Sequence, residues 1–449
     1  MEKIFRSFTL DFPVDKVFSW FSNQGFLKRG IPPFLPISHV NKTKDLKEGL
    51  EIPCEIRMLW KKSPWLLEVK EFVLNKHLVI RQKQGPFAYW EYELNFSSKN
   101  ESTEILQSVS FHYGKYLDAL IKKKVLRAFA YQEEILANDL RTVSAYFKAE
   151  GPKKVLISGG SGFVGSALAP FLQMAGIEVA ILGRSKRTAD ITWDPKTGKI
   201  NPEELENFDA VIHLAGENII GYWSAKKKRR IFRSRVESTK QLSHILSLLK
   251  NPPKLLITAS AIGYYGDRGE EMLTEASSVG NGFLADVCKH WEDASKPART
   301  QNIRTVHTRF GMILSPGGGA LQKMLPLFKM GLGGRLGSGR QYTSWITIDD
   351  VTGAMYNILM SSNLEGPVNF VSPKPLTNKS FTQILANSLQ RPVGPPVPAF
   401  ILRGLFGQMG KEVFLSSARV VPQRLLENGY RFLYPDLKQS LDHLLQIKQ

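Results

Sequence analysis

Cysteine is almost absent from this sequence. Among 449 residues only Cys54 and Cys288 are cysteines, and their wide separation argues against a disulfide framework and fits a reducing compartment. The eight histidines show no metal-ligand spacing with these cysteines, so we expect no metal site. Residues 1–12 alternate polar and apolar side chains and lack the apolar core of a signal peptide. We therefore expect a cytoplasmic protein.

A long, uninterrupted hydrophobic run is also missing. Residues 155–177 carry no charged side chain and are long enough to cross a bilayer, but five glycines, Pro170 and the polar Gln173 interrupt them. A buried strand, a glycine turn and a buried helix explain this composition better. We therefore expect no membrane span.

Acidic residues are outnumbered by basic ones. The chain has 60 Lys and Arg against 41 Asp and Glu, a net charge of +19. Such a surface attracts anions, which include nucleotides, nucleic acids and membrane headgroups. The most basic run, residues 226–235, has helical spacing, and we interpret it as a solvated helix face. We expect no nucleic-acid partner.

Residues 1–148 have the pattern of a separate α+β domain. An alternating strand begins near Ile4, a helix follows Pro13, and residues 115–147 have the spacing of one long helix. The strand-like runs between them lie at residues 51–60, 65–74, 78–83, 87–96 and 104–111. This order and the opening sequence FTLDFPVDKVFSWF resemble the helix-grip superfamily, which includes START-like and polyketide-cyclase-like domains.

That resemblance implies a sheet that wraps the long helix and leaves an apolar cavity for a hydrophobic ligand. The aromatic side chains available to line it are Trp20, Trp60, Trp65, Trp90 and Phe129. The same side chains fit a filled core equally well. Both interpretations stay open at this point.

A glycine motif follows a short linker. Residues 153–168 predict a strand, a turn and a helix start, with glycines spaced G-x-x-G-x-x-G. Gly159 allows a tight turn, Gly162 lets the backbone approach a pyrophosphate, and Gly165 allows the helix to pack closely. The helix N-terminus suits phosphates, and a second strand at residues 178–182 completes the unit. We predict a dinucleotide site.

The second strand indicates which dinucleotide. An NAD site usually has Asp or Glu at its end, about 20 residues after the glycines, to accept from the ribose 2′-hydroxyl. Here Arg184 and Ser185 stand there, and both suit a 2′-phosphate. This favours NADP, with a solvated loop arginine as the alternative. Later strands end near residues 214–216 and 259–260. The residues expected to contact the cofactor are Gly159, Ser161, Gly162, Phe163, Val164, Gly165, Arg184, Ser185, Leu214, Ala215, Gly216, Ala259 and Ser260.

Residues 153–445 resemble an extended short-chain dehydrogenase/reductase. The glycine motif, the His-Leu-Ala-Gly strand end at 213–216 and the segments 260–267, 282–292, 333–339 and 345–350 resemble the atypical bacterial branch described as nucleoside-diphosphate-sugar epimerases. That branch often ends in a small domain of unassigned function. The implied fold is a Rossmann-type doubly wound parallel sheet with a small C-terminal lobe, behind an α+β helix-grip domain. The expected domains are residues 1–148, 153–375 and 376–449.

The chain departs from this family at its catalytic pair. The family uses Tyr-x-x-x-Lys, but the corresponding helix carries Phe283 and Val287. Ser260 is the candidate substrate-orienting serine, and Tyr264 or Tyr265 the candidate proton-transfer group; these tyrosines fit equally well as packing beside the nicotinamide. We expect an NADP-dependent, epimerase-like oxidoreductase acting on a small molecule. The alternative is a non-catalytic NADP-binding sensor or scaffold whose N-terminal domain carries the hydrophobic ligand.

Four further polar residues are candidates for a role in the site or in the core. Arg309 ends a strand and suits either a substrate phosphate or a carboxylate in the core. Asp349 and Asp350 suit either a substrate loop or a helix N-cap. His213 lies inside a strand, and we interpret it as a hydrogen-bonded core histidine.

Overall fold

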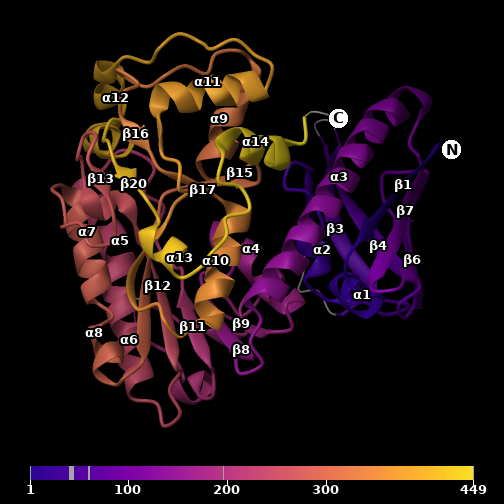
Figure 1. Cartoon of the computed structure of the whole chain (residues 1–449), viewed down its shortest axis with the longest axis horizontal. Coiled ribbons are helices and arrows are strands. Elements are labelled where there is room, and N and C mark those ends of the chain that lie inside the picture. Colours follow the sequence, from indigo (N-terminus) through magenta and orange to yellow (C-terminus); the bar gives the residue numbers. More distant parts are fainter. Residues whose placement is uncertain (1, 40–44, 59–60, 196, 448–449) are drawn as a thin grey trace. The chain divides into compact units, whose positions relative to one another are not determined.

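The computed structural model describes residues 2–39, 45–58, 61–195 and 197–447, and the chain divides into two compact units (Figure 1). The first unit contains the chain up to Ala145, with Ala169–Gly176 and the residues from His443 onward. The second contains Tyr146–Leu168 and Ile177–Asp442. Most of the expected C-terminal domain, residues 376–449, therefore belongs to the same compact unit as the glycine motif.

A curled antiparallel sheet dominates the first unit, with strand order β1-β7-β6-β5-β4-β3-β2. Along β1, Ile4, Phe8 and Leu10 are buried while Phe5 is exposed, so one face of the sheet forms a core. The elements are β1 (Glu2–Leu10), α1 (Val14–Ser22), α2 (Phe26–Arg29), β2 (Ile37–His39), β3 (Glu51–Met58), β4 (Lys61–Val73), β5 (His77–Gln84), β6 (Tyr89–Lys99), β7 (Ser102–His112) and α3 (Lys115–Tyr146). The order agrees with the prediction, except that β2 and α2 were not expected.

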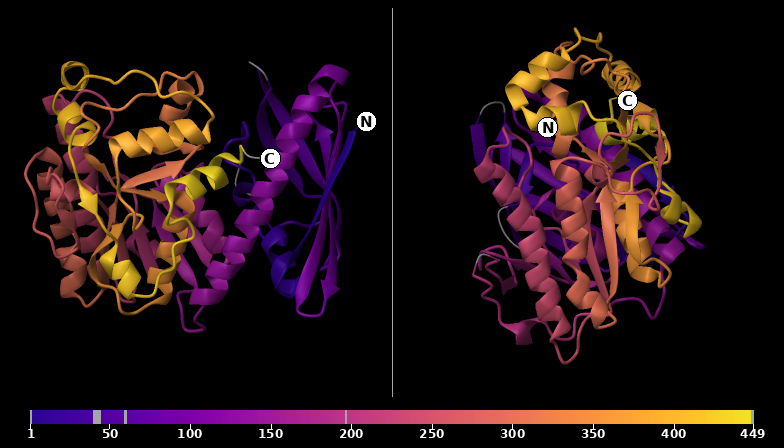
Figure 2. Two further views of the ribbon diagram at one scale, coloured as in Figure 1. Left: turned by 45° about the horizontal axis from the view of Figure 1, so that its top comes forward. Right: turned by 90° about the vertical axis from the view of Figure 1, so that its left-hand side faces the viewer.

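The long helix α3 covers that face (Figure 2). Ile121, Val125 and Phe129, each four residues apart, are buried in one cluster with the strands. Near the middle of α3, Tyr131 stacks on His443 with 5.4 Å between ring centroids, and Arg127 Nε donates to the Gln446 carbonyl over 3.0 Å. The last described residues of the chain are therefore fixed against α3.

Of the five aromatic residues expected to line a cavity, Trp20 instead belongs to the packed core. Trp20 is 3% exposed, packs against Phe21 and Phe26, and directs its indole nitrogen 3.3 Å from Asp139, which forms a buried ion pair with Arg29. It is not among the residues that line the cavity of this unit described below. Trp60 lies outside the described residues.

The second unit is built on a seven-stranded parallel sheet in the order β10-β9-β8-β11-β12-β14-β18. Its strands are β8 (Lys154–Ser158), β9 (Glu178–Gly183), β10 (Ile191–Thr192), β11 (Ala210–His213), β12 (Leu255–Ala261), β14 (Arg304–Phe310) and β18 (Gly366–Phe370). The chain leaves β8 toward β9 on one side and returns to β11 on the other. In such Rossmann-like sheets, ligands bind at the carboxyl ends of the strands where the order reverses.

Helices and short strands make up the rest of the structure, and two of these helices, Phe163–Met174 and Leu437–Leu445, contribute residues to both units. The helices are α4 (Phe163–Met174), α5 (Ala225–Phe232), α6 (Ser238–Ser247), α7 (Phe283–Asp293), α8 (Lys296–Thr300), α9 (Gly319–Lys329), α10 (Ile348–Met360), α11 (Asn378–Ser388), α12 (Ala399–Phe406), α13 (Gln423–Glu427) and α14 (Leu437–Leu445). The short strands are β13 (Met272–Leu273), β15 (Met312–Ser315), β16 (Tyr342–Thr343), β17 (Trp345–Thr347), β19 (Leu376–Thr377) and β20 (Arg419–Val420). Single helical turns are η1 (Pro202–Leu205), η2 (Arg233–Glu237), η3 (Ile262–Tyr265) and η4 (Gly410–Phe414).

The uncharged segment 155–177 forms most of β8, the glycine turn and α4. Its strand portion is buried in the centre of the sheet, which accounts for the absence of charge. Within the described ranges, no helix combines the length and the apolar character that a membrane crossing needs.

Candidate functional site

The turn after β8 brings the backbone to the edge where the strand order reverses. Gly159 has a φ of +80°, a conformation that glycine adopts without strain. A Cβ atom on Gly159 would lie 2.9 Å from the backbone nitrogen of Ala215, which follows the neighbouring strand β11. The turn therefore passes directly against the chain leaving β11, and both conformation and space require glycine here.

The start of α4 packs just as closely on this turn. A Cβ atom on Gly165 would lie 2.4 Å from the carbonyl oxygen of Gly159, whereas one on Gly162 would lie 3.1 Å from the same oxygen. The first N–H groups of a helix, here those of Phe163 and Val164, have no partner within it. Together with the partial positive charge of the helix N-terminus, they form a cradle that suits phosphate oxygens.

Side chains around the cradle have separate roles. The ring of Phe163 packs on the chain before α9, since a Cβ atom on Gly318 would lie 2.4 Å from it. This contact holds the half-buried ring against that chain, so the backbone N–H of Phe163 is the group it offers at the start of α4. Ser161 is exposed on the turn.

The end of β9 presents the residues expected to select the coenzyme. Arg184 and Ser185 are both exposed, and Arg184 makes no ion pair with any residue that the structure describes. The hydroxyl of Ser185 accepts a hydrogen bond from the backbone nitrogen of Arg187 over 3.3 Å, which fixes the start of this loop. No carboxylate stands at the strand end itself, since Gly183 is followed directly by this arginine.

An arginine that sequence analysis did not single out lies beneath the end of β11. Arg235 donates to the Glu217 carbonyl over 3.0 Å, lies over the Trp291 ring at 5.0 Å, and sits 3.4 Å from where a Cβ atom on Gly216 would be. Burial lowers the pKa of Arg235. It supports the turn through Leu214 and Gly216, and its only signal in the sequence was its place in a strongly basic run.

A buried polar cluster lies at the ends of β12 and β14. Ser260 donates to Glu292 over 2.7 Å, and Arg309 holds the same carboxylate through two hydrogen bonds of 2.8 Å each. Arg309 also donates to the hydroxyl of Tyr265 over 2.9 Å. Burial alone acts to lower the pKa of Arg309, but the Glu292 carboxylate outweighs it and raises that pKa. Of the two interpretations offered for Arg309, the structure shows the pairing with a carboxylate in the core.

Comparison with known proteins identifies the family. A family model described as NAD dependent epimerase/dehydratase family matches residues 155–370, and one for a domain of unknown function matches residues 397–444. An epimerase family protein of Mycobacterium bovis is 38% identical over 292 residues, which cover 64% of this chain and 96% of the relative. The chain belongs to the epimerase family.

Two solved structures extend the family match. The nucleoside-diphosphate sugar epimerase from Corynebacterium glutamicum superposes with a TM-score of 0.83 at 30% identity, covering 98% of this chain and 90% of that one. The human epimerase family protein SDR39U1, solved with NADPH, gives a TM-score of 0.62 at 32% identity over 66% of this chain and 99% of that one. The predicted family, its Rossmann-like sheet and its C-terminal domain of unknown function are thus confirmed.

At Phe283 and Val287, where the resemblance places the family's catalytic pair, the structure has an aromatic and aliphatic cluster, with the Lys228 nitrogen 5.3 Å from the centre of the Phe283 ring. The Phe283 ring meets Trp223 edge-on at 5.2 Å, and Val287 is 1% exposed in the same cluster. The backbone nitrogens of Phe283 and Leu284 donate to the carboxylate of Glu412 over 3.1 and 2.9 Å. The N-terminus of α7 is therefore occupied by a carboxylate from the C-terminal domain, a contact that no local sequence pattern revealed.

The two candidate tyrosines separate clearly. Tyr265 is 0% exposed, and its hydroxyl donates to Asn369 over 2.7 Å while accepting from Arg309. Burial raises the pKa of Tyr265 to about 12. Because η3 turns this side chain into the polar cluster, both hydrogen-bonding functions of its hydroxyl are already used, and a role for Tyr265 in proton transfer stays a prediction. Tyr264 is only partly buried, and its ring lies 3.5 Å from the Arg309 guanidinium carbon.

Two other predicted polar groups belong to the framework. Thr347, rather than either aspartate, caps α10, and the buried Asp350 accepts from the backbone nitrogens of Leu433 and Tyr434 over 2.7 and 3.2 Å. Burial raises the pKa of Asp350 to about 6. His213 is fully buried, which lowers its pKa to about 4, and its nearest polar partner is Ser238 at 3.5 Å. Both groups hold the fold together.

Proposed function

We propose that the second unit binds NADP(H), with the pyrophosphate on the turn 159–165, the 2′-phosphate at Arg184 and Ser185, and the nicotinamide end toward residues 214–216, Ala259 and Ser260. The observation that carries the proposal is the exposed, unpaired Arg184 at the end of β9, where an NAD site has a carboxylate. The NADPH in the human relative's structure supports the same choice.

Removing the charge of Arg184 should change coenzyme preference. A charge-assisted hydrogen bond contributes about 1.5–3 kcal/mol, so Arg184→Ala should weaken NADPH binding about 10- to 100-fold. NADH lacks the 2′-phosphate, and its dissociation constant should change less than about threefold. Calorimetric titration of both coenzymes measures the ratio.

The matched control is Lys240→Ala, because Lys240 is an equally exposed cation on α6. It removes the same charge from the surface and should leave both affinities unchanged. Equal affinity of the parent protein for NADPH and NADH would contradict the proposal, and so would an unchanged ratio in Arg184→Ala.

We further propose an epimerase-like oxidoreductase acting on a small molecule without the usual Tyr–Lys pair. Ser260, Tyr264 and Tyr265 are then the candidate polar groups at the nicotinamide end, and of the two tyrosines Tyr264 is the more exposed. Neither Phe283 nor Val287 can exchange a proton, and this favours a second candidate, a sensor that binds NADP(H) without turnover. Transfer of deuterium from labelled NADPH to small molecules that copurify with the protein supports the enzyme; tight NADPH binding with no transfer supports the sensor.

The remaining assignments form part of the same proposal. Residues 1–148 are a START-like, helix-grip domain that takes up a hydrophobic ligand, residues 153–375 form the dinucleotide-binding domain, and residues 376–449 form the C-terminal domain. Burial raises the pKa of Cys54 to about 11 and that of Cys288 to about 12, so both thiols are unreactive at neutral pH, in keeping with a cytoplasmic protein.

A further inference from the structure

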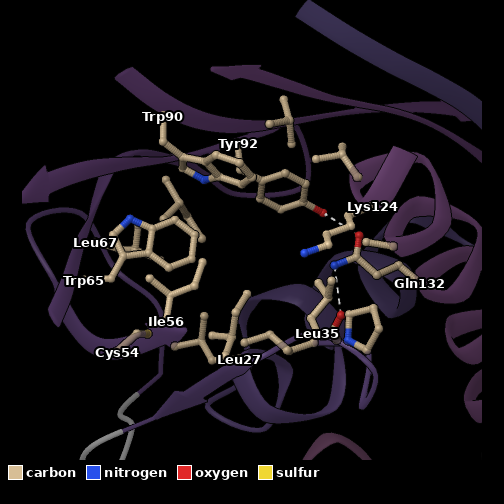
Figure 3. Close-up of a pocket in the computed structure, with 18 of the residues that line it drawn as sticks. Leu27, Leu35, Cys54, Ile56, Trp65, Leu67, Trp90, Tyr92, Lys124 and Gln132 are labelled. Carbon is tan, nitrogen blue, oxygen red and sulfur yellow. Dashed lines mark hydrogen bonds between the residues drawn. The ribbon is translucent and has the colours of Figure 1, made fainter. Parts of the chain in front are cut away.

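The first unit contains a cavity of about 180 Å³ between its sheet and α3 (Figure 3). Its walls come from the strands β3 to β7, from α3 and from the loop after α2. Trp65, Trp90 and Phe129, three of the aromatic residues named from the sequence, do line it. The sequence was compatible with a cavity or with a filled core at this place, and the structure has a cavity.

Most of this lining is apolar. The Trp65 and Trp90 rings meet edge-on at 5.3 Å, and Phe87 packs against both at 5.6 and 4.8 Å. Cys54 also lines the cavity, and because burial raises its pKa to about 11, its thiol stays neutral there. An engineered apolar cavity of about 150 Å³ stays dry and binds benzene, so a space of this size suits a single ring or a short alkyl chain.

Polar side chains gather on the side of the cavity opposite Trp65. Figure 3 shows Tyr92, Lys124 and Gln132 there, with the Lys124 nitrogen directed into the space. The Tyr92 hydroxyl lies 3.4 Å from the Gln132 side-chain oxygen, and the Gln132 amide donates to the Gly30 carbonyl over 2.9 Å. Burial raises the pKa of Tyr92, so its hydroxyl remains a neutral donor.

Lys124 is the single charged side chain among the described residues that line the cavity. Nothing in the described part of the chain forms an ion pair with it, whereas Lys122, on another face of α3, lies 3.9 Å from Glu2. Lys124 is an exposed residue of α3, and it lies at the edge of the buried stripe, because Ile121 is three residues before it on a neighbouring part of the helix surface. Lysine can pack its alkyl chain along an apolar surface while its charged nitrogen stays at a polar or solvent-exposed position.

We propose that this cavity binds a small apolar molecule that carries one anionic group, such as a monocarboxylate. The apolar body lies among the indole rings, and the anion is paired with Lys124 and hydrogen-bonded by Tyr92. An anion that enters an apolar cavity must be paired with a positive charge, and Lys124 is the positively charged side chain in the lining. The inference rests on the proposal that the first unit takes up a hydrophobic ligand, and it specifies the chemistry of that ligand.

Octanoate and octanol test the inference on the full-length protein, because they share one alkyl chain and differ in charge. Calorimetric titration should show that Lys124→Met weakens octanoate binding about tenfold and leaves octanol binding within about twofold. Lys123→Met is the matched control: it removes an exposed cation one residue away that does not line the cavity, and it should change neither affinity. Lys124→Glu should reject octanoate and accept octylamine in its place.

The ligand proposal and the charge inference fail in different ways. Ile56→Trp places a large ring in the cavity and should abolish binding of both probes while NADPH affinity is retained. If the parent protein binds neither octanoate nor octanol at millimolar concentration, the hydrophobic-ligand proposal falls and takes the inference with it. If both bind, and octanoate binding is the same in Lys124→Met as in the parent, the cavity remains a ligand site and only the anionic specificity is overturned.

Discussion

Glu292→Ala should lower the free energy of unfolding of the second unit by about 3–5 kcal/mol. The substitution removes the carboxylate that Arg309 holds through two hydrogen bonds and leaves a guanidinium, whose side chain is 3% exposed, with a single tyrosine hydroxyl as partner. Breaking a buried ion pair on one side costs this much because the remaining charge stays desolvated. Differential scanning calorimetry should show the transition lowered by on the order of 10 °C.

Two further variants separate the effect of the unpaired Arg309 charge from the effect of altered packing. Asp293→Ala removes an exposed carboxylate from the next position on α7, and such a surface change should alter stability by less than about 0.5 kcal/mol. The double variant Glu292→Leu with Arg309→Met removes both charges and should recover most of the loss, because an apolar pair often replaces a buried ion pair at little cost. A double variant as unstable as Glu292→Ala would show that packing around Ser260, rather than an orphaned charge, determines the loss.

The polar cluster shows where prediction from sequence ends. The glycine spacing and the strand–helix rhythm are local patterns, and they were sufficient to predict the turn at Gly159 and the parallel sheet. The partner of Arg309 was not predictable, because Glu292 lies on a different element and only the packing of α7 on the sheet brings the two together. The same holds for Glu412, which reaches the N-terminus of α7 from more than a hundred residues away.

Tyr264 and Tyr265 show a second limit. Consecutive residues of a single helical turn point in directions roughly 120° apart, so which of them is buried depends on where η3 begins. The sequence fixes the pair but leaves that start undetermined within one residue. The first unit shows a third limit. Lys124 is an exposed lysine of α3 like Lys122 and Lys123, and only the folded structure shows that it also lines the cavity.

The expected result with the largest effect on ligand binding concerns the glycine cradle. Gly165→Ala should weaken NADPH binding about 100-fold or more, equivalent to about 2.7 kcal/mol. The added methyl group would lie 2.4 Å from the carbonyl oxygen of Gly159 and 2.7 Å from the Cα atom of Gly160, so α4 must move away from the turn. Its first N–H groups then leave the positions from which they hold the pyrophosphate. Calorimetric titration with NADPH, on samples whose circular dichroism shows a folded protein, measures the loss.

Gly404→Ala is the matched control, because the same methyl group added to α12 meets nothing within 4 Å. It should leave NADPH affinity unchanged and, as a glycine-to-alanine change within a helix, raise stability by up to about 1 kcal/mol. Gly165→Ala should also weaken NADH, since the pyrophosphate is common to both coenzymes, whereas Arg184→Ala should weaken NADPH alone. If Gly165→Ala retained normal affinity for both coenzymes, the phosphates could not lie on this turn, and the dinucleotide would have to bind elsewhere on the sheet.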